Sequence, residues 1–274
     1  MMSTLIAVVA ELLRGVCRAW FRLAAYRRFI GDFSSWEEAR LRSGGYDSAL
    51  IVEKVRRAAI KVKNGGAVFE RDSVVFGQVD YSFPVLAALL CSAVESQNRL
   101  SVLDFGGSLG SHYYQNRAFL SGVKAIEWSV VEQTAFVESG RNQFQDEILK
   151  FYFNVDECLR ERNPGVLLLS SVLPYLPDPR GFLASVLRKG FPMIVVDRTP
   201  LIPGSRDRLT VQRVPPSVYP ASYPAWFFSR DRFLDEFRAG YELCAEFDAL
   251  AGRIPLSGGV TAVDKGFIFR RKIA

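Results

Sequence analysis

The segment from Val102 to Ser111 is the feature that most constrains the fold of this chain. An apolar run, Val-Leu-Asp-Phe, passes directly into Gly-Gly-Ser-Leu-Gly-Ser. We predict a strand over residues 100–105, a tight turn over 106–110, and a helix that begins at about Ser111. A glycine-rich turn between a buried strand and a helix lets a ligand approach the backbone closely, and the start of the helix favours negative groups. The segment therefore predicts a cofactor-binding loop at the end of a strand.

After this segment, apolar runs alternate with helical stretches. We predict further strands over residues 128–132, 151–155, 166–171 and 193–197. Between the last two, Asp178, Pro179 and Gly190 are residue types preferred at the boundaries of a helix. Strands that are apolar throughout and separated by helices indicate a parallel sheet covered on both faces. The expected fold is therefore α/β, a Rossmann-like three-layer sandwich with a mostly parallel sheet.

The C-terminal part of the chain is expected to complete this sheet. Prolines and aromatic residues are concentrated over 214–228, and we predict a loop there, followed by a helix from Ser229. Two last strands are predicted over 241–247 and 265–271, on either side of a glycine pair that suits a hairpin-like return.

The first hundred residues are predicted to be helical. Ser34 and Glu37 have the spacing of a capping box, with Ser34 as the N-cap. Two more helices are expected over 47–63 and 83–94. We therefore divide the chain into an amphipathic N-terminal helix (1–30), a helical cap region (31–98) and a Rossmann-like cofactor-binding domain (99–274).

The N-terminal segment has an apolar stripe at helical spacing, with arginines on the opposite side. Residues 1–30 hold five arginines and a single acid, Glu11. One interpretation is that the stripe packs on the rest of the protein or on a second subunit in a homodimer. The other is contact with an anionic membrane surface. The uncharged opening, Met1 to Ala10, is too short to span a bilayer, which needs about 20 apolar residues.

Composition narrows the class of protein further. Of 274 residues, 49% are hydrophobic and 23% charged, which excludes a disordered chain. The net charge is +6, and the N-terminal segment carries most of it, so no broad nucleic-acid surface is expected. The four cysteines are widely separated and there is one histidine, so we expect no metal site. This cysteine usage fits a reducing, cytoplasmic compartment.

The glycine loop distinguishes between two classes of cofactor. The dinucleotide pattern G-x-G-x-x-G fails, because serine stands at 108 and at 111. The pattern D-x-G-x-G-x-G of S-adenosylmethionine-dependent methyltransferases fits better, at Asp104, Gly106 and Gly110, with Ser108 in the middle glycine position. Glu132 ends the next predicted strand, where an acid can accept two hydrogen bonds from a ribose diol.

Several segments together resemble one bacterial family of methyltransferases in the class I S-adenosylmethionine-dependent superfamily. Asp-Phe-Gly-Gly-Ser-Leu-Gly-Ser at 104–111 is the most specific, and shorter matches lie at 45–47, 70–73, 131–133, 170–173, 197–200 and 219–226. The resemblance covers roughly residues 30–270. Members of the family tend to lie near surface-polysaccharide genes. The resemblance implies a class I methyltransferase fold and S-adenosylmethionine as cofactor, held by Asp104, Gly106, Gly107, Ser108, Gly110, Glu132, Ser170 and Ser171.

The expected reaction is methyl transfer to an oxygen or nitrogen of a small-molecule or glycan-related acceptor. Three residues are candidates for the acceptor side. His112 could accept a proton from a hydroxyl as a neutral imidazole, and Asp197 is a rival base. Tyr223 lies on the aromatic segment and could stack on a sugar. Two alternatives stay open: a non-catalytic binding module with the same fold, and a nicotinamide-dependent oxidoreductase.

Overall fold

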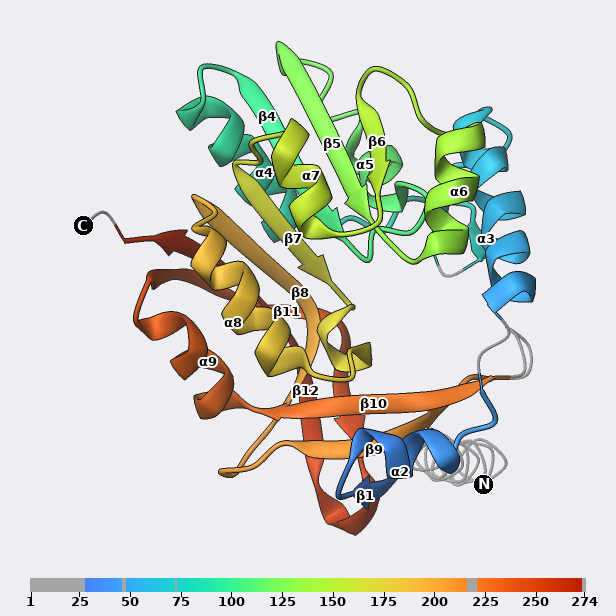
Figure 1. Cartoon of the computed structure of the whole chain (residues 1–274), viewed down its shortest axis with the longest axis vertical. Coiled ribbons are helices and arrows are strands. Elements are labelled where there is room, and N and C mark those ends of the chain that lie inside the picture. The colour runs from blue at the N-terminus through green and yellow to red at the C-terminus, as the bar shows by residue number, and fades with distance from the viewer. Residues whose placement is uncertain (1–27, 46–47, 72, 216–220, 273–274) are drawn as a thin grey trace, which may run out of the picture.

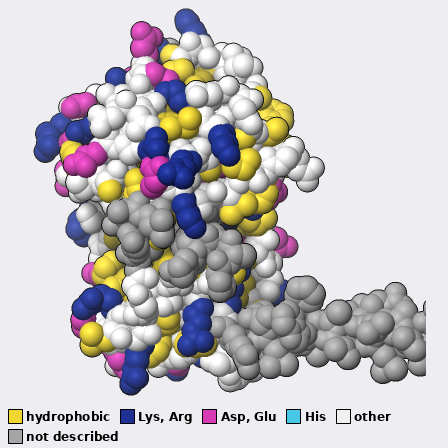
Figure 2. Space-filling model, turned by 90° about the vertical axis from the view of Figure 1, so that its right-hand side faces the viewer, with side chains coloured by type: hydrophobic (Ala, Val, Ile, Leu, Met, Phe, Trp, Pro, Cys, Tyr) yellow, Lys and Arg dark blue, Asp and Glu magenta, His cyan; other side chains and the backbone are white. Residues whose placement is uncertain are grey.

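The structure is a computed structural model that describes residues 28–45, 48–71, 73–215 and 221–272 (Figure 1). The predicted amphipathic helix lies almost entirely outside these residues. In the ranges described, no helix is long and apolar enough to cross a membrane. On the face shown in Figure 2, basic, acidic and apolar side chains are interspersed.

A central sheet organises the chain in the order β6-β5-β4-β7-β8-β12-β11. Its strands are β4 (Arg99–Phe105), β5 (Ala125–Val131), β6 (Leu149–Tyr152), β7 (Val166–Ser170), β8 (Met193–Ile202), β11 (Tyr241–Pro255) and β12 (Thr261–Arg271). The first five strands in this order pair in parallel, and β12 is antiparallel to both of its neighbours. The predicted α/β fold, a Rossmann-like three-layer sandwich with a mostly parallel sheet, is confirmed.

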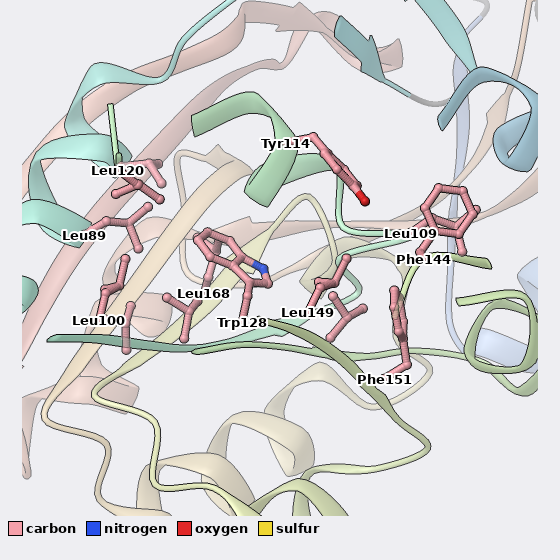
Figure 3. Packing of buried hydrophobic residues seen from close by; sticks show 14 of the residues in the cluster. Leu89, Leu100, Leu109, Tyr114, Leu120, Trp128, Phe144, Leu149, Phe151 and Leu168 are labelled. Atoms are coloured by element: carbon pink, nitrogen blue, oxygen red, sulfur yellow. The ribbon is translucent and has the colours of Figure 1, made fainter. Parts of the chain in front are cut away.

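Helices cover both faces of this sheet, as its continuous apolar strands require. One face is covered by α3 (Ser48–Lys63), α4 (Phe83–Glu95), α5 (Ser111–Asn116) and α6 (Thr134–Gln143), and the other by α7 (Val155–Glu161), α8 (Pro179–Lys189) and α9 (Arg230–Arg238). Side chains alternate along each strand, so Leu100 and Val102 pack toward α4 while Leu103 packs toward α8. Figure 3 shows the first of these cores, with Trp128 at its centre.

A smaller antiparallel sheet lies beyond the carboxyl end of the parallel strands (Figure 1). It consists of β1 (Phe29–Phe33), β9 (Arg208–Arg213) and β10 (Ser222–Ser229), with α2 (Trp36–Leu41) packed on it. The final two residues of β10 pair in parallel with the end of β8, which joins the two sheets.

The prediction of a loop over 214–228 was wrong in its second half, which forms β10. Ala225 and Phe227 point into a small core with Phe29, so the aromatic residues alternate as strand residues do. Pro224 is compatible with this strand because β10 pairs there with β9 alone, and a proline without an N–H is tolerated at a sheet edge.

The cap region is less helical than predicted. Besides α2, α3 and α4, it contains most of β1 and the hairpin of β2 (Phe69–Arg71) and β3 (Val74–Phe76). The capping box is displaced by one residue: Ser35 is the N-cap and accepts the N–H of Glu38 at 3.2 Å, and the Glu38 carboxylate accepts the N–H of Ser34 at 3.0 Å. Because β1 pairs with β9, the boundary at residue 30 falls inside a strand of the second sheet.

Candidate functional site

A cleft of about 1340 Å³ lies between the carboxyl edge of the parallel strands and the smaller sheet. Among the residues that line it are nine predicted as site residues: Gly106, Gly107, Ser108, His112, Glu132, Ser170, Ser171, Asp197 and Tyr223. Asp104 and Gly110 were also predicted as cofactor-binding residues, but they do not line the cleft. The structure therefore brings most of the predicted site together in one place.

The loop after β4 packs so closely that its glycines have no room for a side chain. A Cβ at Gly106 would lie 2.6 Å from Val172, and one at Gly107 would lie 2.5 Å from the carboxylate of Asp104. Gly110 has a φ of +88° and would place a Cβ 2.8 Å from Leu149. Ser108 adopts a φ of +57° although it is not glycine. These contacts explain the glycine pattern and leave the backbone of the loop open toward the cleft.

Asp104 is fully buried beneath this loop. Its Oδ2 accepts a hydrogen bond from the Trp128 indole Nε1 at 3.2 Å, and lies 3.0 Å from Nδ1 of His112. The carboxylate is thus occupied by two side chains on the α5 side of the sheet. In this structure Asp104 supports the loop and His112 instead of facing the cleft.

Glu132 directly follows β5, next to the glycine loop. Its Oε2 accepts the N–H of Gln133 at 2.7 Å, and the backbone of Ser108 also donates to its carboxyl group. Burial, with a smaller contribution from the nearby charge of Asp104, raises the pKa of this carboxyl to about 7 against the opposing effect of the two backbone hydrogen bonds. A carboxyl group that is costly to ionise is therefore held at the wall of the cleft.

A polar cluster lies where the carboxyl end of β7 pairs with the middle of β8. Ser170 Oγ donates to Asp197 Oδ2 at 2.9 Å, and Arg198 Nε donates to Ser170 Oγ at 3.2 Å. Arg198 also lies 3.7 Å from the Asp197 carboxylate. Asp264 of β12 lines the same part of the cleft; burial and the charge of Asp197 raise its pKa. The hydroxyl of Ser170 thus has a partner within the protein, and Asp197 is part of a charged network.

Three residues of the site other than glycine have a left-handed backbone conformation. Ser108, Ser171 and Arg198 have φ between +52° and +57°; the first two follow β4 and β7, and Arg198 lies within β8. Residues other than glycine adopt this conformation at a cost of about 1–3 kcal/mol, and they are found preferentially at functional sites.

An aromatic wall faces this cluster from the smaller sheet and from η1 (Leu173–Tyr175). The rings of Tyr175 and Tyr223 meet edge to face, with centroids 5.4 Å apart, and the Tyr175 hydroxyl donates to Gln212 at 2.9 Å. The Trp226 indole donates to the carbonyl of Leu176 at 3.2 Å, which joins the wall to η1.

The hairpin β2–β3 covers the side of the cleft next to α5. Glu70 is buried on β2, and its carboxylate accepts the hydroxyl of Ser111 at the start of α5. Arg71 forms an ion pair with Asp80 at 3.2 Å, and both residues line the cleft. These contacts connect the hairpin to α5 and to the segment that follows β3.

Tyr175, Gln212 and Asp264 are among the polar residues that line the cleft and were not selected from the sequence. Tyr175 lies in the segment after the fourth predicted strand, a few residues beyond the predicted site residues Ser170 and Ser171. Gln212 and Asp264 come from strands far away in the sequence, and only the topology of the sheet brings them to the site.

Comparisons with known proteins give matches of shape alone. No protein-family model matches the chain, and no curated protein matches it in sequence. The N-terminal domain of EvdMO1, solved in the presence of SAH and D-fucose, is 13% identical over 80% of this chain and 97% of its own, with a TM-score of 0.47. CalS10, an amino pentose methyltransferase from Micromonospora echinaspora, is 12% identical over 80% and 97%, with a TM-score of 0.44. A S-adenosylmethionine-dependent methyltransferase from Clostridium acetobutylicum is 9% identical over 70% and 92%, with a TM-score of 0.43.

Proposed function

We propose that this chain is a S-adenosylmethionine-dependent methyltransferase that modifies an oxygen or nitrogen of a small-molecule or glycan-related acceptor. The observation that carries the proposal is the arrangement of Glu132 beside the glycine loop. The backbone of Ser108 in that loop donates to the Glu132 carboxyl, and both residues line the same cleft. An acid at the end of the second strand of an α/β sheet is placed to bind a ribose diol.

The residues present fit this cofactor. Any side chain at Gly106 or Gly107 would displace the loop, so the glycines keep its backbone accessible for an amino-acid and nucleoside ligand. A diol hydrogen-bonded to Glu132 would supply partners for a carboxylate that burial otherwise disfavours. When bound, S-adenosylmethionine supplies an electrophilic methyl group on a positively charged sulfur.

The chain itself binds and orients the reactants in this proposal. The glycine loop lies along the methionine and sugar part, Glu132 binds the ribose hydroxyls, and Ser170 and Ser171 line the methionine side. Asp197 and Tyr223 lie on the acceptor side, where the aromatic wall provides stacking surfaces and hydroxyl groups. Methyl transfer needs donor and acceptor in line, so positioning supplies most of the catalysis.

Two other functions stay as alternatives. A nicotinamide-dependent oxidoreductase is disfavoured by the serines at 108 and 111, which replace glycines of the dinucleotide pattern. A non-catalytic module that binds the cofactor without turnover would use the same loop and the same glutamate.

Calorimetry on the full chain separates these functions. We expect S-adenosylhomocysteine and S-adenosylmethionine to bind and NAD and NADP not to bind. Gly106→Ala should abolish binding, because its Cβ would meet Val172, whereas Gly122→Ala, which has open space around it, should bind as the wild type does. Binding of NADP alone would refute the proposal. Transfer of a labelled methyl group to an acceptor excludes the non-catalytic module.

We also propose that residues 1–28 attach the protein reversibly to an anionic membrane surface on the cytoplasmic side. Each basic residue near such a surface contributes roughly 1 kcal/mol, and an apolar helix face adds burial. A lipid-carried polysaccharide precursor would be available there. Liposome flotation at low and high salt tests this: salt-sensitive flotation that is lost on deletion of residues 1–28 supports attachment. A loss of thermal stability on deletion, without flotation, favours packing on the protein body or on a second subunit.

A further inference from the structure

The single histidine of this chain lies against Asp104, the most deeply buried acid among the residues that the structure describes. His112 is in the first turn of α5, lines the cleft, and has a side chain that is 15% exposed, whereas the Asp104 side chain is 0% exposed. Nδ1 of the imidazole lies 3.0 Å from Oδ2 and 3.2 Å from Oδ1 of the carboxylate. The ring is thus held from one side by the protein interior.

These contacts determine which ring nitrogen carries the proton. A carboxylate only accepts hydrogen bonds, so the nitrogen that contacts it must be a donor. The Trp128 indole, which can only donate, is aimed at the same oxygen at 3.2 Å. The neutral imidazole therefore has its proton on Nδ1 and a lone pair on Nε2.

We propose that Asp104 is a positioning residue that fixes His112 in the Nδ1–H tautomer, so that Nε2 accepts the proton of a hydroxyl acceptor in the cleft. This inference rests on the proposed methyltransferase function and narrows its acceptor to a hydroxyl group. The proton of the acceptor O–H moves to Nε2, and the oxygen uses its electron pair to bond to the methyl carbon. The bond between that carbon and sulfur breaks, and its electron pair stays on sulfur. The charge that forms on the imidazole is balanced by Asp104.

The surroundings of His112 agree with this role. Gly107 lies directly over the Asp104 carboxylate with no space for a side chain, so water is excluded from that side of the pair. The other candidate base, Asp197, already accepts the hydroxyl of Ser170 and lies beside Arg198. Other charged groups near α5 are on the covering hairpin and the segment after it, where Glu70 receives the hydroxyl of Ser111 and Arg71 pairs with Asp80. Arg117 caps the C-terminal end of α5 and lies 5.4 Å over the ring of Tyr114, and the Glu132 carboxyl interacts electrostatically with Asp104.

Because the chain has one histidine, NMR of the untagged full-length protein labelled with [15N]histidine gives a single imidazole. We expect a protonated Nδ1 and an unprotonated Nε2 for the neutral ring. In Asp104→Asn the amide oxygen accepts the Trp128 indole and the amide NH₂ faces Nδ1, so the spectrum should shift toward the Nε2–H form. Asp178→Asn, at the N-cap of α8 where asparagine is equally suitable, should leave the signals unchanged. A neutral Nε2–H tautomer in the wild type overturns the proposal, whether or not the asparagine variant folds.

Binding and turnover separate this inference from the proposed function. We expect His112→Asn to bind S-adenosylhomocysteine within about threefold of the wild type and to lose transfer to hydroxyl acceptors by roughly 100-fold or more. Transfer to hydroxyl acceptors that the variant retains in full would overturn the assignment of His112 as the base. If the wild type binds no S-adenosylhomocysteine, the proposed function fails, whatever the tautomer. If no compound of a panel of sugars and phenols is methylated, the NMR spectrum of His112 still tests whether Asp104 holds the imidazole in the Nδ1–H tautomer.

Discussion

Glu132→Gln is the substitution that most directly tests the site, because it should stabilise the protein and weaken cofactor binding. Burial raises the pKa of this carboxyl from 4.5 to about 7 in the folded protein. Between these values the folded state binds more protons than the unfolded state, so the free energy of unfolding falls as the pH rises from 4.5 to 7. Each pKa unit corresponds to about 1.4 kcal/mol, so ionised Glu132 costs about 3 kcal/mol at pH 8.

A glutamine carries no charge at any pH and removes this dependence. The difference in unfolding free energy between Glu132→Gln and the wild type should therefore increase by about 2–3 kcal/mol from pH 5 to pH 8. For a chain of this size that corresponds to roughly 5–10 °C in the difference between the two melting temperatures. All other titrating groups cancel in this comparison. Glu138→Gln on the exposed face of α6 is the control for the effect of the substitution itself.

Cofactor binding should depend on pH in the opposite sense. A diol needs the ionised carboxylate as acceptor, so the affinity of the wild type for S-adenosylhomocysteine should rise about tenfold from pH 6 to pH 8. Glu132→Gln should bind more weakly by about 1.5–3 kcal/mol at pH 8 and show no such rise. Thermal unfolding by circular dichroism and calorimetry in the same buffers measure both effects. A stability difference that stays constant from pH 5 to pH 8 would refute the reasoning.

Three further substitutions test other parts of the structure. Gly107→Ala places a Cβ 2.5 Å from the Asp104 carboxylate and should lower the unfolding free energy by about 1–3 kcal/mol in denaturant titrations, whereas Gly122→Ala should have little effect. Arg180→Met removes the ion pairs of Arg180 with Asp207, at 2.7 Å, and with Glu236, and should lower the unfolding free energy by about 1–3 kcal/mol. The exposed Arg160→Met should lower it by almost nothing, and equal effects of the two substitutions would contradict the assigned network. Tyr175→Phe removes the hydrogen bond to Gln212 and should lower the unfolding free energy by about 1 kcal/mol, while the affinity for S-adenosylhomocysteine stays unchanged. A loss of that affinity would place Tyr175 on the cofactor side.

Most of the central fold was predictable because its signals are local. The strand β4, the glycine turn and α8 with Asp178, Pro179 and Gly190 at its ends lie where the sequence predicts them. Each depends on residue types at fixed spacing, and no distant contact is needed to identify it. The strand β10 was missed because Pro224, the prolines before the strand and the aromatic residues favour a loop locally, and pairing with β9 and burial of Phe227 outweigh that tendency.

The direction in which the Asp104 side chain points was not predicted by the glycine-loop motif. The motif places this residue with the cofactor, but side chains alternate along β4, and Leu100 and Val102 pack on the α5 side of the sheet. Asp104 has the same parity, so its carboxylate points toward the helix that carries His112. The alternation was present in the sequence, and applying it to the acid would have predicted the contact.

The glycine loop connects cofactor binding to the histidine, and this limits what loop variants can reveal. One residue of the loop, Ser108, donates to Glu132, while the preceding residue, Gly107, covers the Asp104 carboxylate that holds His112. A substitution that shifts the loop therefore disturbs the diol-binding acid and the positioned imidazole together. Glu132 and Asp104 can be substituted independently of each other and of the loop. Glu132→Gln with its pH profile therefore tests the diol-binding acid, and Asp104→Asn with its imidazole spectrum tests the positioning of His112. Loop variants cannot distinguish these two roles.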